Sequence, residues 1–168
     1  IKKINIQSLI NALKSKKTDK QIVSYIPRKD QTIIIENSVI HFQQYDKGML
    51  ILMCGVGKTL ISLWITQKIN SNTILVGVPS RELLYQWEKV IKILFPDIPL
   101  ITSTDKDIEY IKKFLRNNQK NIVITTYSSS YKVYEAANQI GFIFDMKILD
   151  ETHHLTSFNM KNEETAKT

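Results

Sequence analysis

The stretch MCGVGKT, residues 53–59, joins two segments of different character. The apolar run MLILM (49–53) before it is typical of a buried strand, and the run TLISLWITQKI (59–69) after it is typical of a helix. Gly55 and Gly57 let the backbone adopt conformations that are closed to other residues and approach a ligand closely. A glycine-rich loop between a strand and a helix therefore predicts a phosphate site at the helix N-terminus.

Two further residues of this stretch fit phosphate chemistry. Lys58 is placed to reach the β- and γ-phosphates of a nucleotide, and the hydroxyl of Thr59 is placed to bind Mg²⁺. The alternative is a plain loop with turn glycines and a solvated lysine, since Gly-Lys-Thr also arises by chance. The general P-loop spacing asks for a glycine at position 52, where this chain has Leu52. That departure indicates either a particular branch of P-loop enzymes or a false match.

The composition is that of one globular domain. The chain has 168 residues, of which 43% are hydrophobic. No apolar run approaches the ~20 residues of a membrane span, so no membrane partner is expected. Because the chain begins with Ile1 rather than Met, we expect it to be part of a longer protein.

The net charge of +7 favours a polyanionic partner such as nucleic acid. An A/T-rich coding bias toward Lys, Ile and Asn is an alternative source of that charge. Cys54 is the only cysteine, which excludes an intrachain disulfide and a cysteine-based zinc site. It also suits a reducing compartment, so an intracellular location is expected, either cytoplasmic or, for a large DNA virus, viral.

Strand-like and helix-like segments alternate after the glycine-rich stretch. The expected strands cover 73–78, 99–102, 121–125 and 145–150, and the expected helices cover 80–94, 105–117 and 129–138. This alternation predicts an α/β fold with a mostly parallel sheet and helices on both faces. Ligands of such sheets bind at the carboxyl ends of the strands. Upstream, residues 31–44 fit a strand or a helix and are assigned to a helix, and residues 1–26 form an N-terminal helical extension.

A second polar cluster, DETHH (150–154), follows the last expected strand. Asp150 and Glu151 supply adjacent carboxylates, one to hold Mg²⁺ and one to orient or deprotonate an attacking water. A polar loop after a strand is the alternative, but the P-loop on the same sheet favours the catalytic interpretation. Adjacent His153 and His154 do not have the spacing of a zinc site.

MCGVGKT together with DETH resembles the first motor domain of superfamily-two helicases and translocases. Within them it is most similar to the type III restriction-subunit and DEAD/DEAH-like group. In that group position 52 need not be glycine, so the resemblance accounts for Leu52. His153 matches the DExH type, whereas Thr152 departs from the usual alanine.

Three further segments resemble motifs of that family in order. PRKDQ (27–31) resembles its adenine-recognising motif, and VPSRELLYQW (78–87) resembles the motif that grips the nucleic-acid backbone. ITTYSS (124–129) resembles a threonine-bearing motif at a strand end. The first two also have a plain structural interpretation, as a helix start and an amphipathic helix, and the third is a weak signal on its own.

By this resemblance, the expected catalytic residues are Lys58, Asp150, Glu151 and His153. The expected nucleotide-binding residues are Arg28, Gln31, Cys54, Gly55, Val56, Gly57, Lys58, Thr59 and Leu60. The expected nucleic-acid contacts are Pro79, Ser80, Arg81, Gln86, Thr125 and Thr126, and the expected Mg²⁺ ligands are Thr59 and Asp150, partly through water.

The resemblance implies a RecA-like fold, ATP and Mg²⁺ as cofactors, and nucleic acid, DNA rather than RNA, as partner. Residues 27–168 are expected to form an incomplete first RecA-like motor domain that lacks the next motif, Ser/Thr-Ala-Thr. A second motor domain of the same parent chain would complete a helicase or translocase, so the fragment alone should have little activity. A non-catalytic nucleic-acid-binding domain with a relic P-loop and a P-loop small-molecule kinase are the alternatives.

Overall fold

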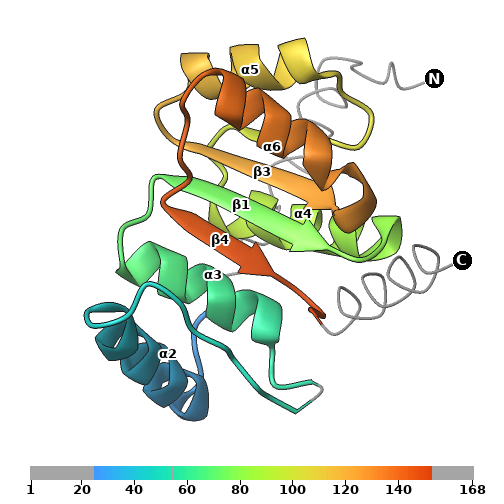
Figure 1. Cartoon of the computed structure of the whole chain (residues 1–168). Helices are drawn as coiled ribbons and strands as arrows, with labels where there is room; N and C mark the ends of the chain where they lie inside the picture. The colour runs from blue at the N-terminus through green and yellow to red at the C-terminus, as the bar shows by residue number, and fades with distance from the viewer. Residues whose placement is uncertain (1–24, 54, 153–168) are drawn as a thin grey trace, which may run out of the picture.

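The computed structural model describes residues 25–53 and 55–152, and they form a parallel sheet with the strand order β2-β3-β1-β4. The strands are β1 (Thr73–Val78), β2 (Leu100–Thr102), β3 (Asn121–Thr126) and β4 (Met146–Leu149). All three pairings are parallel, so the carboxyl ends of the strands lie along one edge (Figure 1). The predicted α/β fold with a parallel sheet is confirmed.

Helices cover both faces of the sheet. They are α2 (Lys29–Phe42), α3 (Lys58–Lys68), α4 (Arg81–Leu94), α5 (Ile108–Asn117) and α6 (Ser130–Gln139), with a short 3₁₀ turn, η1 (Tyr127–Ser129), before α6. In Figure 1, α4 lies behind the sheet and α6 lies in front of it. Helix α2 packs on α3, where Ile35, Ile61, Trp64 and Ile65 form a separate buried cluster.

The alternation of side chains along β1 explains the two faces. Val76 is fully buried and packs with Trp87 and Ile91 of α4, whereas Leu75 packs toward the cluster of α5 and α6. Successive strand residues point to opposite faces, so a strand that is apolar on both faces needs cover on both. The buried residues of α4 recur at helical spacing: Leu84, Trp87 and Ile91.

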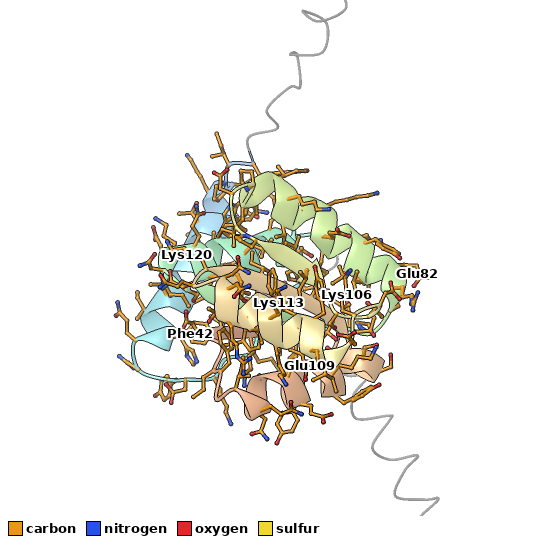
Figure 2. All side chains as sticks on the ribbon, turned by 90° about the horizontal axis from the view of Figure 1, so that it is seen from above. Phe42, Glu82, Lys106, Glu109, Lys113 and Lys120 are labelled. Carbon is orange, nitrogen blue, oxygen red and sulfur yellow. The ribbon has the colours of Figure 1, made fainter. Side chains whose placement is uncertain are left out.

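Helix α4 begins at the carboxyl edge of the sheet. Its N-cap, Ser80, follows β1 directly, and the Ser80 hydroxyl accepts a hydrogen bond from the backbone N–H of Leu83 at 3.3 Å. Figure 2 shows Glu82, at the start of α4, and Lys106, before α5, toward one end of the molecule, with Lys120 toward the other. The start of α4, which follows β1, and the segment before α5, which follows β2, therefore lie toward the same end of the molecule.

One sequence prediction is wrong. Residues 49–53 form no strand in the structure and are not part of the sheet. Leu50 and Leu52 pack against the cluster between α2 and α3, while Met49 and Met53 are 80% and 81% exposed. An apolar run alone predicts burial but does not say whether a neighbouring strand is present to pair with it. The predicted helix at 31–44 is confirmed, as α2.

The N-terminal extension predicted for residues 1–26 lies almost wholly outside the described residues. None of the helices within residues 25–53 and 55–152 combines the length and the apolar character that a membrane span requires.

The packing of β3 yields a stability prediction. Ile124 is fully buried, and its replacement by alanine leaves a cavity, so Ile124→Ala should lower the free energy of unfolding by about 2–5 kcal/mol. The matched control is Ile143→Ala, because Ile143 is 82% exposed and should change stability by less than about 0.5 kcal/mol. Urea unfolding of the two variants measures both values. Equal losses would contradict the assignment of the core.

Candidate functional site

The glycine-rich loop has the conformation that the sequence predicted. Gly55 and Gly57 have positive φ values of 81° and 92°, which residues with a side chain rarely adopt. Gly57 is the N-cap of α3, so Lys58 and Thr59 are the first helical residues. The backbone N–H groups of this first turn have no partner within the helix, and the helix dipole favours an anion there. The conformation suits a phosphate, and the binding of a phosphate here stays a prediction.

Gln31 of α2 is in contact with this loop. Its side chain is 3% exposed; Nε2 donates a 2.8 Å hydrogen bond to the carbonyl of Val56, and Oε1 accepts one of 2.9 Å from the backbone N–H of Arg28. A Cβ at Gly57 would lie 3.0 Å from Nε2 of Gln31. The amide therefore packs closely against the loop backbone, and a side chain at position 57 would require it to shift. Its expected contact with an adenine edge stays a prediction.

Arg28 lies beside Gln31 at the surface. Its guanidinium pairs with Asp30 at 3.0 Å and reaches the carbonyl of Val56 at 3.5 Å. The hydrogen bond from Arg28 lowers the pKa of the Asp30 carboxyl. Because this ion pair is exposed, it contributes little to stability, and Arg28 remains accessible to a ligand.

The structure brings Lys58 close to the second predicted cluster. Its ammonium lies 4.0 Å from Oε1 of Glu151 and 3.5 Å from the carbonyl of Leu52. Glu151 has a φ of 54°, a conformation that costs energy for a residue with a side chain and that is found often at functional sites. The P-loop lysine and the acidic box, about 90 residues apart in the sequence, form one site.

Asp150 makes three hydrogen bonds with described residues. Its backbone N–H donates to the carbonyl of Gly77 at 2.9 Å, which extends the pairing of β4 with β1 by one residue. Oδ2 accepts a 2.9 Å hydrogen bond from Nε1 of Trp87, and the backbone carbonyl accepts one from the hydroxyl of Tyr127. Oδ1 accepts no hydrogen bond from any described residue.

Burial raises the pKa of the Tyr127 hydroxyl to about 12, and the charges of Asp150 and Glu151 add to the effect. Tyr127 therefore stays protonated and keeps its donor throughout the physiological pH range. Neither Trp87 nor Tyr127 was among the site residues expected from the sequence. The available signal was chemical: a buried tryptophan or tyrosine needs a partner for its N–H or O–H.

The expected nucleic-acid contacts lie at the carboxyl edge but differ in access. Arg81 is exposed and pairs with Asp105 at 3.3 Å, and Gln86 is also exposed. Pro79 and Ser80 are half-buried. Thr125 and Thr126 are only 1% and 3% exposed. The hydroxyl of Thr125 donates to the carbonyl of Thr126, and that of Thr126 bonds to Ser128 at 3.1 Å.

Two expected site residues, Cys54 and His153, lie outside the described residues. Val56 and Leu60 pack against the cluster between α2 and α3, which anchors the loop and the first turn of α3. Within the described ranges, His, Cys, Asp and Glu form no group of three or more that would hold a metal ion by themselves.

Comparisons with known proteins show which proteins the chain is similar to. A family model described as "Type III restriction enzyme, res subunit" matches residues 24–167. The DNA 3'-5' translocase XPB2 of Sulfurisphaera tokodaii is 32% identical over 112 residues, which are 66% of this chain and 22% of that protein. The chain thus spans about a fifth of this relative.

Two solved structures are similar in fold. A nuclease-deletion mutant of the Type ISP restriction-modification enzyme LlaGI, in complex with a DNA substrate mimic, has a TM-score of 0.63 and 27% identity, over 77% of this chain and 15% of that chain. The SWI2/SNF2 ATPase core of Sulfolobus solfataricus, in complex with dsDNA, has a TM-score of 0.53 and 15% identity, over 74% of this chain and 31% of that chain. The predicted RecA-like fold is confirmed.

The position of Lys58 yields the first prediction about the site. Lys58→Ala should abolish nucleotide binding and leave the unfolding midpoint unchanged, because the partly exposed ion pair with Glu151, at 4.0 Å, contributes little to stability. Lys68→Ala is the matched control, since Lys68 is exposed at the opposite end of the same helix. Titration with a fluorescent ATP analogue measures binding. A Lys58→Ala variant that binds as tightly as the parent would contradict the P-loop assignment.

Proposed function

The chain belongs to the type III restriction enzyme res subunit family, and we propose that it is the ATP-binding first motor domain of a nucleic-acid-dependent ATPase. The full-length protein would couple ATP hydrolysis to movement on DNA, as a helicase or translocase. The observation that carries the proposal is the approach of Lys58 in the P-loop to Glu151 in the acidic box, 4.0 Å between the charged atoms. These are the two groups that a γ-phosphate and its attacking water require.

The residues of the site would have separate roles in hydrolysis. The backbone N–H groups at the start of α3 and the ammonium of Lys58 bind and orient the β- and γ-phosphates. Glu151 orients the attacking water and accepts its proton. The loose ion pair between Lys58 and Glu151, with both side chains about one third exposed, is weak enough to yield to a phosphate.

The donor set also fits Mg²⁺. This ion prefers oxygen ligands and keeps several of its waters, so one or two protein oxygens together with phosphates complete its shell. Thr59 offers a hydroxyl on the first turn of α3, and Asp150 offers Oδ1, which no described residue occupies. When bound, the ion would neutralise charge that develops on the phosphates.

Nucleic acid is the proposed partner, with DNA favoured over RNA. The curated relative is named as a DNA translocase, and a DNA substrate mimic is bound in the LlaGI structure. The start of α4 supplies a helix N-terminus and the exposed Arg81, both suited to backbone phosphates. Thr125 and Thr126 are weaker candidates than Arg81, because both are buried and both hydroxyls bond within the chain.

Two other proposals of the sequence analysis stand with this function. Residues 27–168 would be an incomplete motor domain, and a second motor domain of the same parent chain would close the cleft. A relic P-loop in a non-catalytic domain is disfavoured, because Lys58, Asp150 and Glu151 are all retained. A small-molecule kinase would have no use for a helix start with an exposed arginine, Arg81, that suits backbone phosphates.

Glu151→Gln tests the hydrolytic role. In the full-length protein we expect ATP binding to persist and single-turnover hydrolysis to fall about 10²–10⁴-fold, because the amide keeps the shape but cannot take the proton. Glu36→Gln, on the exposed surface of α2, is the control. Hydrolysis should also rise when DNA is added. Unchanged single-turnover hydrolysis removes Glu151 from the chemistry, and a rate indifferent to nucleic acid contradicts the motor function.

Arg81→Ala tests the nucleic-acid contact. A phosphate contact positions a strand without reading its sequence, so the variant should weaken binding to unrelated oligonucleotides alike. The slope of log affinity against log salt should become shallower by about 0.7–0.9. Arg116→Ala, near the end of α5, is the matched arginine control. Salt titrations on several oligonucleotides measure the slopes, and an Arg81→Ala slope equal to that of the control would exclude the contact.

A further inference from the structure

Two aromatic side chains outside the P-loop and the acidic box converge on Asp150. Nε1 of Trp87 donates to the carboxylate at 2.9 Å, and the hydroxyl of Tyr127 donates to the backbone carbonyl. Trp87 lies on α4, the helix capped by Ser80, and Tyr127 directly follows Thr126 at the end of β3. Each of the two segments proposed to contact nucleic acid therefore sends one hydrogen-bond donor to the same acidic residue.

Trp87 reaches Asp150 from the face of the sheet that α4 covers. Met146 and Ile148 of β4 pack on that face, and alternation places Asp150 next in the series. Trp87 lies about two turns beyond Ser80, but helical side chains lean toward the helix N-terminus, which directs the indole to the strand ends. The side chain is 2% exposed, so its packing fixes the position of the N–H group.

Tyr127 reaches Asp150 across the opposite face. The ring has room because Gly77 of β1 has no side chain. A Cβ at Gly77 would lie 3.1 Å from Cε1 of Tyr127 and 2.9 Å from Cδ2 of Leu149. Gly77 has no positive φ that would call for glycine, so this close approach is the structural reason for it. Asp150 is thus held from both faces of the sheet.

We propose that Trp87 and Tyr127 are positioning residues that orient Asp150 and couple it to the two nucleic-acid-facing segments. This inference rests on the proposed function and adds to it a route by which nucleic acid controls hydrolysis. An indole N–H can only donate, so Trp87 fixes one carboxylate oxygen and leaves Oδ1 to the ion or its water. A shift of α4 or of residues 126–128 on nucleic-acid binding would move Asp150 relative to the P-loop.

Trp87→Phe in the full-length protein tests the inference, because phenylalanine keeps most of the ring and loses the donor. Partners that orient metal-binding groups typically change metal affinity or activity by 10–100-fold, so the Mg²⁺ concentration that half-saturates binding of a fluorescent ATP analogue should rise by about that factor. Nucleotide binding without Mg²⁺ should match the parent. The stimulation of ATPase by DNA should fall, because the link from α4 to Asp150 is lost.

Trp64→Phe is the matched control. Trp64 is the other tryptophan of the chain and is also buried, at 6% exposed, but it packs between α2 and α3 and bonds to no described residue through its indole. Tyr127→Phe is the second variant and should also raise the Mg²⁺ requirement, with Tyr134→Phe, 74% exposed on α6, as its control. If Trp87→Phe does not fold, Tyr127→Phe decides the question alone.

The outcomes separate this inference from the proposed function. If DNA stimulates the parent, and Trp87→Phe and Tyr127→Phe keep the parent's Mg²⁺ requirement and stimulation, the positioning role is overturned and the motor function stands. A parent whose ATPase responds to neither DNA nor RNA overturns the motor function and the coupling with it. The Mg²⁺ dependence of nucleotide binding still decides in that case whether the two residues orient Asp150.

Discussion

The parallel pairing of β4 with β1 is the constraint on which the candidate site depends. The register sets Leu149 opposite Gly77, and the N–H of Asp150 extends the ladder by one more hydrogen bond to the carbonyl of Gly77. That bond fixes where the acidic box begins. With this register, Glu151 comes within 4.0 Å of Lys58, although the two residues lie far apart in the chain. A slip of one residue would turn Asp150 to the other face, away from Trp87.

Glycine serves the site in two distinct ways. At Gly55 and Gly57 it supplies positive φ values in the loop that leads into α3. At Gly77 it supplies space, so that the ring of Tyr127 crosses β1 to reach Asp150. Gln31 uses space of the same kind beside Gly57, where its amide lies against the loop. The glycines therefore shape the site as much as the charged residues do.

Most of the fold could be predicted from the sequence, because its signals are local. Runs of β-branched residues and amphipathic helices specified β1 to β4 and α4 to α6 to within a few residues. The run MLILM was wrongly predicted to be a strand, because apolar character indicates burial but not the presence of a neighbouring strand. The contacts of Trp87 and Tyr127 with Asp150 could not be predicted from the sequence for a related reason. The sequence indicates that one residue is buried and that the other lies at a strand end, but only the tertiary fold brings Asp150 next to them. For Thr125 the strand-end position was correctly predicted, yet its hydroxyl is buried and bonds within the chain.

A crystal structure of the full-length protein with a non-hydrolysable ATP analogue and Mg²⁺ tests the central claim most directly. The account predicts that the β- and γ-phosphates lie on the backbone of residues 55–59, with the ammonium of Lys58 on the phosphates instead of near Glu151. Oδ1 of Asp150 should face the ion directly or through a water, with Oδ2 still bonded to Trp87. A nucleotide bound elsewhere, or an ion remote from Asp150, would contradict the account.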